Sequence, residues 1–212
     1  LMGDYNLTSV FIDEQLGVHD TLLHVFAAGN SGGITCAPYS TGYATILTGY
    51  QAAKNALCVG SCSKTDAISS FSSRGPVDDG RIKPDVVAVG SSIRSTRPNN
   101  VYQGGSGTSY SAPAITGICA LISEQYQATY GVKPSSSLIK AAIMNTADDL
   151  GSEGPDYIWG YGRVNARRAI SLIAEDRFTT GTMSQGDSVT IEVDIPDNTR
   201  ELRAMLLWTD AA

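Results

Sequence analysis

Three short apolar segments, each bounded by turn residues, predict buried strands in the first half of the chain. They lie at residues 22–28, 56–60 and 84–90, with clusters of Gly, Asn, Ser and Pro around them. Uninterrupted apolar runs between such breakers are typical of parallel strands that are covered on both faces. Residues 1–20 predict a first helix, and the polar stretch 34–55 predicts an irregular insertion between the first two strands.

Helical periodicity dominates the second half of the chain. Over 109–130 the apolar residues recur at steps of three and four, and Gly131 ends the pattern. Ser135 or Ser136 is suited to cap a second helix, because a serine hydroxyl can accept a hydrogen bond from a free N–H of the first turn. A third helix fits 165–174, with the asparagine at its start as the cap.

The pattern changes again near Glu175. Polar and apolar residues alternate with period two over 188–195 and, less strictly, over 202–206. Such alternation is typical of antiparallel strands with one solvated face. The sequence therefore predicts an α/β domain over 1–174, with a parallel sheet flanked by helices, and the beginning of an antiparallel β domain over 175–212.

Charge and composition exclude several classes of protein. Fifteen Lys and Arg residues against 21 Asp and Glu residues give a net charge of −6 and an isoelectric point near 4.8. An acidic chain without a basic patch is a poor candidate for binding nucleic acid, and no apolar run approaches the ~18 residues of a membrane span. We therefore expect no nucleic-acid partner and no membrane span. The chain begins at Leu1 in the middle of a pattern, so we expect it to be cut from a longer protein.

The four cysteines and two histidines form no recognisable metal or catalytic motif. No C-x-x-C pair occurs, so buried free thiols are the favoured interpretation, and a disulfide between Cys36 and Cys62 stays open. His19 lies in a polar stretch and His24 inside an apolar strand segment, and neither has the context of a catalytic base. We identify no metal ligand and no cofactor from these residues.

A glycine-rich segment, residues 104–109, opens the long predicted helix and carries the strongest indication of chemistry. It ends in Thr108-Ser109. Small neighbours let a substrate backbone approach Ser109, whose N–H belongs to the unpaired donors of the helix N-terminus, where the helix dipole favours an oxyanion. The alternative, in which Ser109 only caps the helix, does not account for the glycine run.

A second polar feature follows the first predicted strand, which ends in Gly29-Asn30. An asparagine at the carboxyl end of a strand can donate its side-chain N–H into an adjacent cleft, and active sites of open α/β sheets lie at those ends. Taken alone, Asn30 is more often a turn residue. The inference therefore depends on both segments together.

Together the two segments resemble the subtilisin-like serine peptidases, or subtilases. The family's nucleophile motif, Gly-Thr-Ser followed by a small residue and Pro, matches 107–109 with Ala112-Pro113, and its motif Ala-Ala-Gly-Asn matches 27–30. Further family motifs match in order at 71–76 (F-S-S-R-G-P), 83–86 (K-P-D-V) and 159–165 (W-G-Y-G-R-V-N). The region after residue 174 looks like the start of the β-sandwich that follows the catalytic domain in some subtilases.

The resemblance implies a partial three-layer subtilisin-like fold and serine endopeptidase activity on polypeptide substrates. Ser109 would be the nucleophile, and Asn30 together with the Ser109 N–H would hold the oxyanion. Ala27, Ala28 and Gly29 would line the pocket for the residue before the scissile bond. Many subtilases are exported, so a secreted or cell-envelope protein is expected, and calcium binding is an option for a full-length parent protein.

The Asp and His of the family's catalytic triad have no counterpart in these 212 residues. The motifs D-[ST]-G and H-G-T, which precede Ala-Ala-Gly-Asn in the family, do not occur. A serine hydroxyl without a base is a weak nucleophile. We therefore expect the C-terminal half of a subtilase catalytic domain, inactive alone. Since a half-sheet leaves an unpaired edge, it should associate with the missing N-terminal half or form a homo-oligomer.

Other classes of protein are alternatives. A non-catalytic binding or structural module derived from a subtilase would need neither Ser109 nor Asn30, and the presence of both argues mildly against it. A nucleotide-binding α/β domain fits poorly, because Tyr110 occupies the third glycine position of G-x-G-x-x-G. An α/β-hydrolase fails because Ser111 stands where G-x-S-x-G requires glycine.

Overall fold

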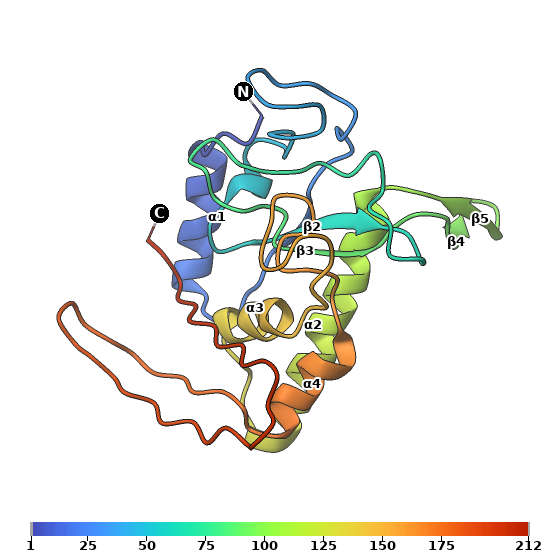
Figure 1. The fold of residues 1–212 in the computed structure, drawn as a ribbon. Coiled ribbons are helices and arrows are strands. Elements are labelled where there is room, and N and C mark those ends of the chain that lie inside the picture. Colours follow the sequence, from blue (N-terminus) through green and yellow to red (C-terminus); the bar gives the residue numbers. More distant parts are fainter. Residues whose placement is uncertain (1, 212) are drawn as a thin grey trace.

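The computed structural model describes residues 2–211, and a three-stranded parallel sheet lies at its centre (Figure 1). The strands are β1 (Val25–Ala27), β2 (Leu57–Cys62) and β3 (Val86–Val89), in the order β1-β2-β3. The three predicted strands are thus confirmed. β2 is buried along its whole length, as expected for a central parallel strand with both faces covered.

Within the described residues, four α-helices surround the sheet: α1 (Leu7–Val18), α2 (Thr108–Tyr130), α3 (Ser136–Asn145) and α4 (Ala166–Ala174). Local sequence sets their ends. The side chains that accept N–H groups at the starts of α1, α3 and α4 belong to Asn6, Ser135 and Asn165. Gly131 ends α2 with a left-handed φ of 73°, which glycine adopts without steric cost. The predicted helices are confirmed, as are the caps at Ser135 and Asn165 and the end of α2 at Gly131, whereas the Asn6 cap was not predicted.

The sheet lies between two layers. Leu57 and Val59 of β2 pack with α2, α3 and α4 in the largest apolar cluster. Cys58 packs on the opposite face with Ile46 and with the 3₁₀ helix η1 (Tyr50–Ala52), both from the irregular segment before β2. This division follows from strand geometry, because successive side chains point to opposite faces. The predicted α/β arrangement, a parallel sheet flanked by helices, is confirmed.

A hairpin that the sequence analysis did not predict joins β3 to α2. It consists of β4 (Ile93–Arg97) and β5 (Val101–Gly105), which pair antiparallel and project from the body of the molecule (Figure 1). Most of its residues are exposed, so no apolar alternation marks the strands. The sequence feature that could have indicated the hairpin is the Asn99-Asn100 pair at its turn. The two residues have φ values of 67° and 56°, a conformation that asparagine tolerates.

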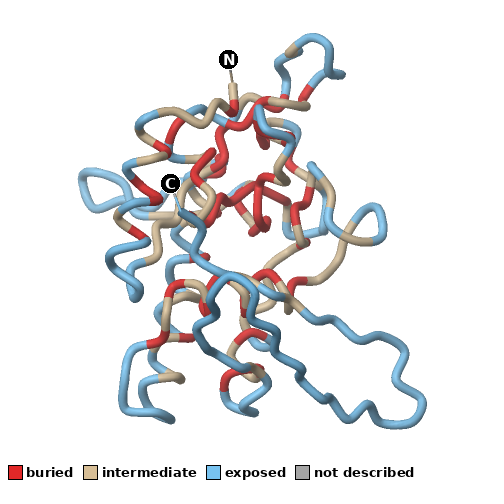
Figure 2. Tube along the Cα trace, turned by 90° about the vertical axis from the view of Figure 1, so that its left-hand side faces the viewer, coloured by how far each residue is buried: buried red, intermediate tan, exposed pale blue. Residues whose placement is uncertain are grey.

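The antiparallel strands predicted over 188–195 and 202–206 are absent from the described structure. Residues 178–211 form no hydrogen-bonded strand, and the chain runs out from the body and back with almost no burial (Figure 2). The apolar members of the alternating pattern are 53–65% exposed: Val189, Ile191, Val193 and Ile195. An alternating strand needs a partner sheet on which to bury its apolar side. No such sheet lies against this segment within residues 2–211. The domain boundary near residue 175 stays a prediction.

A buried cluster of charges lies at the amino end of the sheet. Lys83, Asp85 and Lys140 are 2%, 4% and 5% exposed. Lys83 Nζ donates to Asp85 Oδ2 at 2.7 Å, and Lys140 Nζ lies 3.5 Å from Asp85 Oδ1. Both ammonium groups also donate to Ala56 O, and Cys58 N–H donates to Asp85. Burial would raise the pKa of Asp85, but the charges of Lys140 and Lys83 outweigh burial and hold that pKa below its ordinary value.

Candidate active site

Asn30 and Thr108 meet at the carboxyl end of β1, although 78 positions separate them in the sequence. Asn30 Oδ1 accepts a hydrogen bond from Thr108 N–H at 2.9 Å and another from Thr108 Oγ1 at 3.1 Å. Because a backbone N–H can only donate, the Asn30 atom that faces it is the oxygen, and the amide nitrogen Nδ2 points away. Asn30 is exposed, so Nδ2 is available to an acceptor from outside. The anchoring role of Thr108 was not predicted, although the Gly-Thr-Ser motif pointed to this residue.

Ser109 lies in the first turn of α2, directly after Thr108, and is exposed. The helix cap is Gly107, which has no capping side chain, so the alternative in which Ser109 is the N-cap is wrong. Within residues 2–211 the Ser109 N–H and hydroxyl have no hydrogen-bond partner. An unpaired N–H at a helix N-terminus attracts negative charge. Here the Ser109 N and Asn30 Nδ2 both lie near Gly107, at 3.8 Å and 3.5 Å from the position a Cβ on Gly107 would take.

Close backbone approach holds the start of α2 against the end of β3. Gly107 N–H donates to Gly90 O at 3.0 Å, and the Ser111 hydroxyl donates to Ala88 O at 3.0 Å. A Cβ on Gly90 would lie 2.2 Å from Ser111 Oγ, so only glycine fits there. A Cβ on Gly107, whose φ is 156°, would lie 3.5 Å from Asn30 Nδ2. These glycines fix the position of Ser109 relative to Asn30.

The three residues expected to line a substrate pocket lead directly to Asn30. Ala28 and Gly29 are buried and Ala27 is partly buried. Gly29 has a φ of 117°, and a Cβ on it would lie 2.7 Å from Leu47 Cγ. Its N–H donates to Thr108 Oγ1 at 3.3 Å, which ties the strand end to the helix start. The assignment of Ala27, Ala28 and Gly29 to substrate binding stays a prediction.

Neither histidine is placed to act as a base for Ser109. His24 is half-buried, stacks on Phe26 with 5.6 Å between the ring centroids, and shares a 3.1 Å hydrogen bond between Nε2 and Gln15 Oε1. Burial lowers the pKa of His24. His19 is exposed at the end of α1, where its backbone N–H donates to Gln15 O. The His24 ring is therefore engaged in structural contacts, whereas for His19 only backbone hydrogen bonds are found within residues 2–211.

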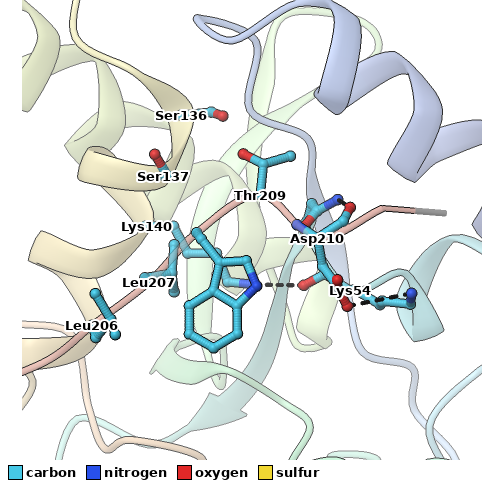
Figure 3. A pocket seen from close by; sticks show the side chains of 10 residues that line it. Lys54, Ser136, Ser137, Lys140, Leu206, Leu207, Thr209 and Asp210 are labelled. Carbon is cyan, nitrogen blue, oxygen red and sulfur yellow. Dashed lines mark hydrogen bonds and ion pairs between the residues drawn. The ribbon is translucent and has the colours of Figure 1, made fainter. Parts of the chain in front are cut away.

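Two hollows of the described surface lie away from Ser109. One, of about 200 Å³, is an open hollow between α3, the segment before β2 and the last residues of the chain (Figure 3). Its lining includes Lys54, Lys140 and Asp210, and Lys54 Nζ lies 3.3 Å from the Asp210 carboxylate. A second, of about 210 Å³, lies beside Lys83 and Asp85. Neither contains a residue of the Asn30–Ser109 site.

Metal and membrane features can be described for residues 2–211. Within this part of the chain no three His, Cys, Asp or Glu side chains gather closely enough to hold a metal ion. The four cysteines are free thiols there, so the Cys36–Cys62 disulfide is not formed. No helix of the described residues combines the length and apolar character that crossing a membrane requires.

Comparison with known proteins gives matches over most of the chain. The sequence profile of the Subtilase family matches residues 5–162. Thermitase of Thermoactinomyces vulgaris is 38% identical over 146 residues, which are 69% of this chain and 43% of thermitase. The minor extracellular protease Vpr of Bacillus subtilis (strain 168) is 40% identical over 133 residues, 55% of this chain and 16% of Vpr. C5a peptidase of Streptococcus pyogenes is 40% identical over 110 residues, 48% of this chain and 9% of that protein.

A solved structure supports the fold. The prenylagaramide maturation protease PagA has a TM-score of 0.59 and 23% identity to this chain, over 72% of this chain and 51% of PagA. The chain thus spans less than half the length of the curated relatives described here. The matched region includes both β1 with Asn30 and the start of α2 with Ser109. By its sequence profile and its relatives, the chain belongs to the subtilase family.

Proposed function

We propose that this chain supplies the nucleophile and the oxyanion donors of a serine endopeptidase site. The observation that carries the proposal is the pair of hydrogen bonds from Thr108 to Asn30 Oδ1, which leaves Asn30 Nδ2 free on the side of the exposed Ser109. The Ser109 Oγ would give its proton to a base from outside these residues and attack a peptide carbonyl, while Nδ2 and the Ser109 N–H donate to the oxyanion. The peptide C–N bond would then break, leaving an acyl-enzyme and an amine protonated by that base. Water would then release the acyl group.

A base for Ser109 has to come from outside these 212 residues. His24 is engaged with Gln15 and Phe26, and His19 ends α1. Without a base the serine hydroxyl is weakly nucleophilic, so we propose that the isolated chain has little or no peptidase activity. A longer parent protein, or a complementing segment, would provide the aspartate and histidine.

The proposed complementing segment would pair with β1 and cover α2. Within the described residues β1 pairs only with β2, so its other edge is open. Ala114, Gly117 and Leu121 of α2 are exposed, Leu121 to 48%. A parallel sheet is normally covered on both faces, and an open edge favours pairing. We therefore propose that an upstream part of a subtilase domain, or failing that a second copy of this chain, occupies this surface. The likeness to an extracellular protease supports secretion.

The test is mass analysis after treatment with a fluorophosphonate, a reagent that adds to a serine only where a base and an oxyanion hole are assembled. The 212-residue chain is treated beside the longest form of the protein that its source produces. One adduct on Ser109 in the longer form, absent from Ser109→Ala and present in Ser106→Ala, supports the proposal. Ser106 is a matched control because it is an exposed serine three positions away.

A second candidate function is a non-catalytic module built on the subtilase fold. The open β1 edge and the exposed face of α2 favour it, since both suit association. An adduct on Ser109 in any form of the protein contradicts this candidate. The absence of an adduct in every form, with the fold intact by circular dichroism, contradicts the peptidase proposal instead.

A further inference from the structure

The segment that carries Ser109 has a local charge opposite to that of the whole chain. Residues 86–123 contain no Asp and no Glu, but they contain Arg94 and Arg97, whereas the chain has a net charge of −6. Both arginines belong to β4 and are exposed. Residues 21–53, which include Asn30, contain no Asp, Glu, Lys or Arg at all. The two arginines are therefore the charged side chains of the segments that build the site.

The side chain of Arg97 runs back along the hairpin toward Ser109. In the backbone, Arg97 pairs with Val101 at the turn end of the hairpin, and Gly105 lies at the other end. Yet the Arg97 guanidinium donates to the hydroxyl of Tyr110, the residue that follows Ser109. A Cβ on Gly105 would lie 2.1 Å from Tyr110 Oη and 3.1 Å from Arg97 Nη2. Glycine at 105 thus leaves the space in which the hydroxyl of Tyr110, the sequence neighbour of Ser109, holds the guanidinium.

The Arg97 guanidinium keeps most of its hydrogen-bonding capacity. A guanidinium has five N–H donors, and the Tyr110 hydroxyl uses one of its nitrogens. Within residues 2–211 neither Arg97 nor Arg94 forms an ion pair, while the Arg94 guanidinium lies 5.8 Å from the centre of the Tyr102 ring. A planar guanidinium with free donors fits a carboxylate in bidentate geometry.

We propose that Arg97, positioned by Tyr110, forms a subsite for an acidic side chain of the polypeptide substrate, close to the scissile bond. The inference rests on the proposed peptidase function. It adds a preference for Asp or Glu near the cleaved bond, which nothing in the Asn30–Ser109 geometry requires. Arg97 is a specificity residue here and takes no part in bond breaking.

The experiment uses a preparation in which Ser109 reacts with the fluorophosphonate. Peptide substrates are compared in pairs that differ only by Asp against Asn at one of the three positions on either side of the cleaved bond. At one position we expect kcat/KM to be about tenfold higher for Asp at low salt, the size expected of a charge-assisted hydrogen bond. The ratio should fall at high ionic strength, because Arg97 is exposed.

Three variants sharpen the test. Arg97→Gln should bring the Asp to Asn ratio close to one, and Tyr110→Phe should lower it in part, because the guanidinium loses the hydroxyl that holds it. Arg200→Gln is the matched control, since Arg200 is an exposed arginine of the tail, and it should leave the ratio unchanged. A ratio near one in the unmodified protein, or a ratio that Arg97→Gln does not change, overturns the inference alone. The absence of Ser109 labelling in every preparation overturns the peptidase proposal, and the inference with it.

Discussion

The two ends of the parallel sheet hold polar clusters that differ in how their hydrogen bonds are used. At the amino end, Lys83, Asp85 and Lys140 satisfy one another away from water. At the carboxyl end, Asn30 uses its oxygen on Thr108 and leaves its amide nitrogen open. In the first cluster the charged groups are buried and paired with one another, whereas the second presents unused donors to a ligand.

The difference separates residues that stabilise the fold from residues that can act on a substrate. Charges removed from water need partners, so loss of one member of the buried charge cluster leaves the others buried and unpaired. An exposed donor at a helix start is solvated in the free protein, and it stabilises the transition state only when an oxyanion forms beside it. Stability and activity should therefore respond to different substitutions, and four predictions test this separation.

The largest effect is expected for Asp85→Asn, which removes the charge and keeps the size. Two buried ammonium groups would lose their carboxylate, and we expect a loss of about 3–5 kcal/mol in the free energy of unfolding. Urea denaturation measures this. Asp79→Asn is the control, because Asp79 pairs with Arg81 at the surface and such pairs are worth roughly 0–1 kcal/mol. Equal effects of the two substitutions on the free energy of unfolding would contradict the claim that the buried charges depend on Asp85.

The second prediction concerns the open end. Asn30→Ala should lower turnover by about 10²–10³, the loss measured when the side-chain donor of the oxyanion hole is removed from a subtilisin, a magnitude that we adopt from that enzyme. The free energy of unfolding should fall by only about 1–2 kcal/mol, because Thr108 loses the two hydrogen bonds that Asn30 Oδ1 accepts. Asn30→Asp keeps the oxygen that faces Thr108 and removes only the donor, so it should lose at least as much turnover. Full activity of Asn30→Asp would exclude an oxyanion role for Nδ2.

A smaller effect is expected for Thr108→Val, which keeps the shape of the side chain and removes its hydroxyl. Asn30 would lose one of its two anchoring hydrogen bonds, and Gly29 N–H would lose its acceptor. We expect about a fivefold loss of kcat, since a net hydrogen bond is worth ~1 kcal/mol. Thr116→Val is the control on the same helix, where the hydroxyl donates only to Ala112 O. A change in KM with kcat intact would show that Thr108 acts on substrate binding and not through Asn30.

The smallest effect is expected from titration of Asp148, a partly exposed carboxylate. Burial would raise its pKa, but hydrogen bonds from Arg163 and Asn165 and the charge of Arg168 outweigh burial and hold the pKa below its ordinary value. A carboxyl whose folded-state pKa is depressed contributes stability above its unfolded pKa of about 4, and this stability is lost as the pH falls through the folded-state value.

The measurement for this fourth prediction is urea denaturation at pH 6 and pH 3. Asp148→Asn should reduce the difference in unfolding free energy between the two pH values by less than about 1 kcal/mol, because the ion pairs are partly exposed. Asp187→Asn, in the exposed tail, is the control and should leave the difference unchanged. A larger pH difference in Asp148→Asn than in the unmodified chain would reverse the assigned sign.

Much of the secondary structure could be predicted because its causes are local. Asn165 and Ser135 cap their helices through N–H groups only three positions away, and Gly131 ends α2 through its own backbone conformation. The buried strands followed from short apolar runs. The hairpin between β3 and α2 escaped prediction because its strands are exposed, so no hydrophobic pattern distinguishes them from a loop.

In the tail, residues 178–211, the sequence pattern instead predicted strands that the structure does not form. Its alternating residues, such as Val189 and Ile191, carry the local preference of a strand, but a strand also needs a neighbour to hydrogen-bond and a surface on which to bury its apolar side. Within residues 2–211 neither is provided. A sequence pattern therefore predicts what a segment is suited to form, and the rest of the molecule decides whether it forms.

By itself, the sequence determined most helix ends and the three buried strands, and it pointed to Asn30 and Ser109 as candidate catalytic residues. These features depend on side-chain type and on neighbours within a few positions. Only the tertiary structure decided which atom of Asn30 faces outward and where the guanidinium of Arg97 lies. Both depend on contacts between segments far apart in the chain, Asn30 with Thr108 and Arg97 with Tyr110. Such contacts exist only once the sheet and α2 have packed together.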